Sequence, residues 1–184
     1  IDQRPGGPVS SSASPWVQGA VVDGYGSGIA DSRVTVVPLG PGKGKMETLR
    51  TTTDRKGRFT LELPTTHPVR IEAIHPRYGR GQLRVEGGDE PVEEAIVTLT
   101  QPNLDLEAWN ARLAPFGATL WRDGDAVQVL EVEPSGVAAR SGVTRGDFIL
   151  SAKEVRDGAV RLELARDHSS ATVTLIPSGD DDDQ

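Results

Sequence analysis

The sequence of 184 residues contains no cysteine and few aromatic residues. Without cysteine the chain can form no disulfide, no zinc–thiolate site and no catalytic thiol. It also lacks any run of about 18 apolar residues, so no segment is predicted to span a membrane. Aromatic residues make up 4% of the chain, which has 21 glycines and 13 prolines. This balance favours many short strands over long helices.

The clustered basic charge that nucleic-acid binding needs is missing as well. Residues 1–101 carry twelve basic and twelve acidic side chains, whereas residues 102–184 carry eight basic and fifteen acidic ones. The net charge of −7 therefore arises in the second half, where Asp180 to Asp183 supply four negative charges. Such a surface would repel phosphate, so we exclude DNA and RNA as partners.

Residues 1–15 contain Pro, Gly and Ser without periodicity, which predicts a flexible linker. Because the chain begins at Ile1 without a methionine or a signal-like run, we expect a piece of a longer protein, tethered through an upstream segment. From Trp16 onward, seven runs alternate between apolar and polar residues: WVQGAVVD, RVTVVPL, ETLRTTTD, GRFTLELP, PVRIEAIHP, GQLRVEG and VEEAIVTLT. This spacing predicts a β-sandwich of about a hundred residues.

The alternation breaks at TQPNLD, and LDLEAWNARLAPFG follows. Leu106, Trp109 and Leu113 fall on one face of a short helix. Asn103 and Asp105 are the candidate N-caps of this helix. The strands ATLW and AVQVLEVE come next, joined by RDGD, whose Asp-Gly pair favours a tight hairpin.

The stretch EVEPSGVAARSGVTRGDFIL predicts a short helix between two strands. Pro134 ends the first strand, and Ser135 is a candidate N-cap. Ala138 and Ala139 would let the helix lie close against a sheet, because no large side chain intervenes. Gly142 supplies a left-handed residue at which the helix can end.

After this helix, Val143 is expected to make the apolar contact that often accompanies such an end. Asp147 can bond turn amides before the buried strand FILSA. Only KEVRDG separates FILSA from AVRLELA, which is too short for an α-helix. The remainder, AVRLELARDHSSATVTLIP, predicts a hairpin of two alternating strands.

The order strand, EPSGVAARSGV, RGDFIL resembles the PDZ domain, in particular bacterial variants with a P-x-S-x-A-x-x-A-G-L-x-x-G-D-x-I segment. The resemblance is good over residues 127–150 and extends over residues 114–177. It implies a small PDZ-like β-barrel with one or two short helices over residues 104–177, followed by an acidic disordered tail at 178–184. PDZ domains bind extended peptides, usually C-termini, by strand addition.

The same resemblance implies a peptide-binding site. Backbone amides of the loop from Ala114 to Gly117 would hold the peptide carboxylate, and the strand from Ala118 to Trp121 would pair with the peptide. The implied site residues are Pro115, Phe116, Gly117, Ala118, Thr119, Leu120 and Trp121. The helix that forms the second wall of the family's groove has no counterpart in KEVRDG. Either that wall is missing, or the helix at residues 105–114 replaces it.

Residues 16–101 resemble the carboxypeptidase regulatory-like, transthyretin-like sandwich. GAVVDGYGSGIADSRV, from Gly19 to Val34, matches the first signature of that family, and TTDRKGRF, from Thr52 to Phe59, matches a later T-x-D-x-x-G-x-F. The resemblance implies a seven-stranded Greek-key β-sandwich. Such domains mostly serve as spacers or as adhesion and folding modules in extracellular and periplasmic proteins.

Three further motifs are better explained by structure than by chemistry. The RGD tripeptide at 145–147 leads into a strand, so its Gly-Asp pair belongs to a turn. GPGKGK at 40–45 lacks Walker spacing and predicts a hairpin loop. DGYGSG at 23–28 predicts a glycine-rich turn, because it lacks the acidic density of a calcium loop.

Titratable residues suggest no active site. His67, His75 and His168 lie far apart, without metal-ligand spacing. Glu93 and Glu94 are expected on opposite faces of a strand, which is poor geometry for acid–base chemistry. We therefore expect no enzyme activity, no cofactor and no metal.

The expected function is that of a non-catalytic protein–protein interaction module of a bacterial cell-envelope protein, periplasmic or extracellular. The sandwich would act as a spacer, and the PDZ-like domain would bind a peptide or protein partner. Two alternatives remain: a substrate-recognition fragment of a larger envelope protease or secretion component, and a purely structural spacer.

Overall fold

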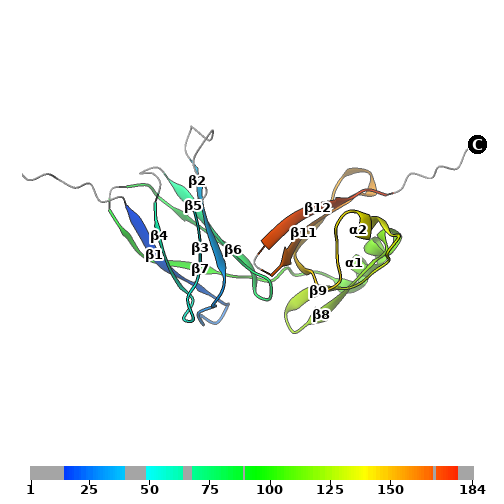
Figure 1. The fold of residues 1–184 in the computed structure, drawn as a ribbon, viewed down its shortest axis with the longest axis horizontal. Helices are drawn as coiled ribbons and strands as arrows, with labels where there is room; N and C mark the ends of the chain where they lie inside the picture. The colour runs from blue at the N-terminus through cyan, green and yellow to red at the C-terminus, as the bar shows by residue number, and fades with distance from the viewer. Residues whose placement is uncertain (1–14, 40–48, 64–67, 89, 168, 178–184) are drawn as a thin grey trace, which may run out of the picture.

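The computed structural model describes residues 15–39, 49–63, 68–88, 90–167 and 169–177 (Figure 1). Over these residues the chain is mainly β, with strands arranged in three sheets. No helix in the described part of the chain is long and apolar enough to cross a bilayer.

The strands β1 to β7 form two sheets, which together are called the N-terminal part. One sheet has the order β4-β1-β7 and the other β3-β2-β5-β6. Strand β1 is antiparallel to β4 and parallel to β7. A strand lies in each of the seven alternating runs: β1 Trp16–Val22, β2 Arg33–Pro38, β3 Leu49–Thr52, β4 Arg58–Glu62, β5 Val69–His75, β6 Gly79–Val85 and β7 Val92–Thr98.

The two sheets of the N-terminal part share one hydrophobic core. Val17 and Val21 on β1 are fully buried, as are Val34 and Val36 on β2 and Ile71 on β5. Alternate residues of these strands are more exposed, as a period of two requires. β-Branched side chains pack well on such a pleated surface. The two sheets share the core that these side chains form, which is a sandwich-like arrangement.

Strand β7 contains a bulge beside β1. The pairing Val17↔Val92 is followed by Gly19↔Ala95, so β7 holds one residue more than β1 over this stretch. Glu94, inside the bulge, has a φ of 63°. A Cβ at Gly19 would lie 2.0 Å from the Ala95 carbonyl oxygen, so only glycine fits there.

The remaining elements, called the C-terminal part, build one antiparallel sheet of order β12-β11-β10-β9-β8. The expected β-barrel is wrong, because β8 and β12 are open edges of this sheet within the described residues. Helix α1 packs against β8, so the sheet ends there instead of closing. The elements are α1 Leu106–Leu113, η1 Ala114–Phe116, β8 Ala118–Asp123, β9 Ala126–Val132, α2 Val137–Arg140, β10 Phe148–Glu154, η2 Arg156–Gly158, β11 Val160–Arg166 and β12 Ser169–Leu175.

Helix α1 has the predicted cap and face. The Asp105 carboxylate accepts a hydrogen bond from a first-turn N–H at 3.2 Å, so Asp105 and not Asn103 is the N-cap. Leu113 is fully buried, and Leu106 and Trp109 pack against the core of the C-terminal part.

Helix α2 fulfils most of its prediction. Ala138 is fully buried, Gly142 has a φ of 88°, and the Val143 N–H donates to the Ala138 carbonyl at 3.0 Å. The predicted N-cap Ser135 is wrong. Gly136 takes that position with extended backbone and no side-chain cap, because a tight turn delays the helix start by one residue.

The connection between β10 and β11 holds no α-helix. It is the single 3₁₀ turn η2, in which Asp157 has a φ of 59°. The prediction that KEVRDG is too short for an α-helix is therefore confirmed.

Three arginines of the N-terminal part bond oxygen atoms of the C-terminal part. The pairs are Arg77 with the Asp123 carboxylate at 3.1 Å, Arg80 with the Glu163 carboxylate, and Arg33 with the Ser170 hydroxyl at 2.6 Å. Each part has a hydrophobic core cluster of its own. A domain boundary near Pro102 stays a prediction.

Candidate functional site

The loop implied to bind a carboxylate is the turn η1 between α1 and β8. Pro115 opens this turn and Gly117 ends it with a φ of 73°. Phe116 is buried in the C-terminal core. The Gly117 N–H donates to the Ala114 carbonyl at 3.0 Å. This amide therefore already has a partner within the turn.

Gly117 also packs against the end of β9. A Cβ at Gly117 would lie 2.9 Å from the Glu133 Cβ and 3.0 Å from Glu133 Oε2. The Glu133 N–H donates to the Gly117 carbonyl at 2.8 Å. The nearby Glu133 carboxylate would repel the carboxylate of a peptide C-terminus at this loop.

The strand implied to pair with a peptide is β8, at one edge of the sheet. Ala118 and Leu120 point into the core, whereas Thr119 and Trp121 are exposed. The structure thus places the seven implied site residues on one loop and one sheet edge. The structure also shows a contact between helix α1 and this edge, which the sequence did not predict.

Helix α1 occupies part of the β8 edge through Asn110. The Asn110 Nδ2 donates to the Leu120 carbonyl at 3.1 Å, and the Leu120 N–H donates to Asn110 Oδ1 at 2.7 Å. An added strand would use the same pair of backbone groups. Asn110 therefore takes the place of one residue of a pairing strand.

A second contact holds the start of α1 to the same strand. The Arg122 guanidinium, on β8, donates to the Leu104 carbonyl at 2.9 Å. Helix α1 is thus fixed to β8 through two side chains, Asn110 and Arg122. The sequence shows the helix but gives no signal for its position beside β8, because both contacts depend on tertiary packing.

Asp147 of the RGD tripeptide forms an ion pair with Arg166. Asp147 is 1% exposed, and its carboxylate accepts a hydrogen bond from the Thr144 N–H at 2.8 Å, which confirms its predicted turn contact. Arg166 donates to the same carboxylate from Nε at 2.6 Å and from Nη2 at 2.7 Å. These hydrogen bonds and the Asp147 charge raise the pKa of Arg166 above its ordinary value. Arg145 and Gly146 are exposed, but the buried and paired Asp147 carboxylate is not presented to a partner.

The expected orientation of Glu93 and Glu94 is wrong. Both residues line one open hollow of about 610 Å³ on the outer face of the β4-β1-β7 sheet. The bulge in β7 breaks the strict alternation, so neighbouring side chains can reach the same face. The hollow is lined by Gln18, Gly19, Ala20, Arg58, Glu93, Glu94 and Ile96.

No group of three or more His, Asp or Glu side chains in the described chain could hold a metal ion. The His75 ring packs edge-on against Tyr78, with 5.0 Å between ring centroids. His67, His168 and the GPGKGK loop at 40–45 lie outside the described residues.

DGYGSG forms the predicted glycine-rich turn. Asp23 Oδ1 accepts hydrogen bonds from the Tyr25 and Ser27 N–H groups, each at 2.9 Å. The Asp23 carboxylate is thus engaged within its own turn, as Asp commonly is in such loops.

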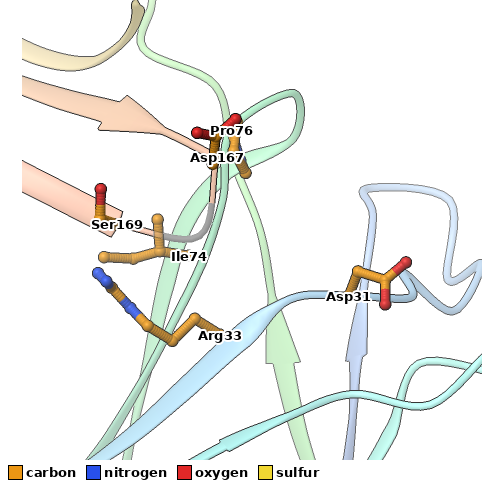
Figure 2. Close-up of a pocket in the computed structure, with 6 residues that line it drawn as sticks. All are labelled: Asp31, Arg33, Ile74, Pro76, Asp167 and Ser169. Carbon is orange, nitrogen blue, oxygen red and sulfur yellow. The ribbon is translucent and has the colours of Figure 1, made fainter.

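A crevice lies where the N-terminal part meets the hairpin of β11 and β12. Figure 2 shows Arg33 reaching from β2 toward Ser169, with Asp31 farther away on its loop. The crevice leaves no room for even a water-sized ligand. It is lined by Asp31, Arg33, Ile74, Pro76, Asp167 and Ser169.

No protein-family model matches this sequence, and no curated protein matches it. Among solved structures, the chain is similar to the crystal structure of a DUF3823 family protein from Parabacteroides merdae. The two share 10% identity with a TM-score of 0.39, over 88% of this chain and 95% of that one. A likeness this remote says nothing of family or partner.

Proposed function

We propose that this chain is a non-catalytic protein-interaction module of a bacterial cell-envelope protein, in the periplasm or outside the cell. In this proposal the N-terminal part is a carboxypeptidase regulatory-like, Greek-key sandwich that acts as a spacer. The C-terminal part is a PDZ-like domain that binds an extended segment of a partner by strand addition.

The open five-stranded sheet is the observation that carries this proposal. Its edge strands β8 and β12 do not pair with each other in the described chain, so backbone N–H and C=O groups remain at the edges. Strand addition uses these groups for affinity and leaves specificity to side-chain pockets. The motif after β9, with buried Ala138 and the turn at Gly142, supports the PDZ-like interpretation.

At β8, an incoming peptide competes with helix α1. The peptide must displace Asn110 from both backbone groups of Leu120 before it can pair there. An Asn110→Ala variant lacks these two hydrogen bonds, so a peptide that pairs with β8 should bind to it more tightly than to the unmodified chain.

Fluorescence polarisation with two peptide libraries tests the proposal. One library presents free C-termini, and the other presents extended internal segments with blocked ends. Both are screened against the whole chain, against Asn110→Ala and against Asn103→Ala, a matched control at an exposed asparagine outside α1. We expect saturable binding from at least one library. If no peptide binds to any of the three proteins, the interaction proposal is wrong.

A structural spacer is the second candidate, favoured by the three arginine contacts between the parts. These contacts would hold the two parts in one orientation, as a spacer requires. Small-angle scattering of a triple Arg33→Ala, Arg77→Ala, Arg80→Ala variant tests this candidate. A spacer predicts a broader distribution of distances in the variant, whereas an unchanged profile would count against it.

A further inference from the structure

Charged side chains mark nearly every sheet edge in the described chain. Six strands lie at edges, namely β3, β4, β6, β7, β8 and β12. Five of them contain Arg, Asp or Glu, which discourage pairing with another chain: Arg50 on β3, Arg58 and Glu62 on β4, Arg80 and Arg84 on β6, Glu93 and Glu94 on β7, Arg122 and Asp123 on β8. Strand β12, SSATVTL, contains no charged residue.

The other common protections of a sheet edge are also missing at β12. It pairs with β11 over seven consecutive residues without a bulge, whereas β7 and β8 each carry a register shift. It contains no proline and is rich in threonine and valine, which favour strands. In the described chain no helix packs along it as α1 packs along β8, although Arg33 of the N-terminal part bonds the Ser170 hydroxyl near its start.

Strand β12 packs one face against the core of the C-terminal part and exposes the other face to solvent. Leu175 is fully buried, whereas Ser170, Thr172 and Thr174 are exposed. Arg166 and Ser169 are register partners that flank a two-residue connection, and in such a hairpin the flanking pair exchanges both backbone hydrogen bonds. Alternation then directs the backbone groups of Ser170, Thr172 and Thr174 away from β11.

Building on the proposed strand-addition function, we infer that β12 is the docking edge, and that its occupant is an extended, basic segment of another protein. Residues 102–184 carry the whole net charge of −7, so electrostatic attraction favours a segment with Lys or Arg. A second copy of this chain would bring the same negative charge to the interface and is disfavoured. Thr172 and Thr174 carry no charge and would not repel a basic strand, whereas the Arg33 guanidinium at Ser170 would repel a basic residue placed there.

Two synthetic strands serve as probes, fluorescein-labelled KTVTVTVK and its acidic counterpart ETVTVTVE. Their anisotropy is measured with the whole chain and with Thr172→Pro, which removes an outward N–H without breaking a bond to β11. Thr172→Val, which keeps the N–H, is the matched control. A Thr172→Lys, Thr174→Lys double variant repels the basic probe and replaces Thr172→Pro if circular dichroism shows that the proline variant is unfolded.

We expect KTVTVTVK to bind about tenfold more tightly than ETVTVTVE at low salt, with the difference reduced at high salt. Thr172→Pro should weaken binding about tenfold or more, because an edge without its N–H cannot complete the ladder. Thr172→Val keeps this N–H and should weaken binding far less than Thr172→Pro, and Asn110→Ala, at the opposite edge of the sheet, should leave binding unchanged.

The contrary outcomes separate the two proposals. If Asn110→Ala tightens binding and Thr172→Pro has no effect, the docking edge is β8. The inference about β12 then fails, while strand addition stands.

Equal affinity for both probes overturns the inference that the partner segment is basic. Concentration-dependent dimerisation, seen by light scattering and abolished by Thr172→Pro, would identify a second copy as the occupant. If neither probe nor any library peptide binds, both proposals are wrong.

Discussion

Two pairs of glycines, one pair from each part of the molecule, stand in different surroundings. A Cβ at Gly19 or Gly28, in the N-terminal part, would lie 2.0 or 2.1 Å from a carbonyl oxygen of another segment. Gly124 and Gly142, in the C-terminal part, have nothing within 4 Å of the Cβ position, but their φ angles are 62° and 88°. The first pair permits close backbone approach, and the second pair permits a left-handed turn.

This difference indicates which glycine positions tolerate change. Substitution at Gly19 must move a neighbouring strand, whereas substitution at Gly124 affects only its own turn. Turns and edges that touch nothing else can vary without loss of the core, and binding surfaces commonly lie on such segments. Such open turns occur in both parts, at Gly24 and Gly26 as well as at Gly124 and Gly142.

The largest effect should follow from Gly19→Ala. The new methyl group would collide with the Ala95 backbone, and we expect the free energy of unfolding to fall by about 3 kcal/mol. Gly24→Ala, whose Cβ would meet no atom within 4 Å, is the matched control and should change stability by less than about 1 kcal/mol. Urea denaturation measures both. Equal losses in the two variants would show that close approach is not what Gly19 provides.

Ala138→Leu tests whether the C-terminal part also contains a close contact. Ala138 is the fully buried residue of α2, so a leucine there should cost about 2 kcal/mol by overpacking. Ala139, one position further along the helix, is partly exposed and serves as the control. Thermal unfolding of both leucine variants should separate them. A tolerant Ala138 would mean that α2 does not pack closely on the sheet.

Arg166→Met should have a somewhat smaller effect. It leaves the buried Asp147 carboxylate with the Thr144 contacts but without its cationic partner. Because half of the Arg166 side chain is exposed to solvent, we expect a loss of about 1 to 2 kcal/mol. Asp147→Asn combined with Arg166→Met should restore part of this loss in urea denaturation. If the double variant is as unstable as the sum of the two single variants, the pair is not coupled.

The smallest effect is expected for Gly124→Ala. With open space around the Cβ, only the left-handed backbone opposes alanine, at a cost of about 1 kcal/mol. Gly124→Asn should cost less, because asparagine tolerates this conformation better. Chemical denaturation of the two variants gives the comparison. A loss as large as that of Gly19→Ala would remove the distinction between the two kinds of glycine.

Features determined by nearby residues could be predicted from the sequence. Asp105 caps α1, and Gly142 and Val143 end α2 as expected, because caps depend on residues within one or two turns. Period-two alternation located the strands of the N-terminal part for a similar reason. Pairing order and sheet closure depend on distant contacts, which is why the expected barrel was wrong.

The candidate site depends even more on distant contacts. Nothing in the spacing of Asn110 and Leu120 indicates that a side-chain amide bonds both backbone groups of an edge residue. The β7 bulge that brings Glu93 and Glu94 to one hollow likewise arises from pairing with β1. Absence of charge on β12 is visible in the sequence, but it gains meaning only when β12 is known to be an edge.

The arginine contacts between the two parts have an evolutionary consequence. No residue belongs to both core clusters in the described chain, and Arg33, Arg77 and Arg80 reach across as side chains. Replacing one of these arginines would remove a contact between the parts without disturbing either core. Single surface substitutions could therefore change the orientation of the docking edge during evolution, while both folds and the edge itself stay unchanged.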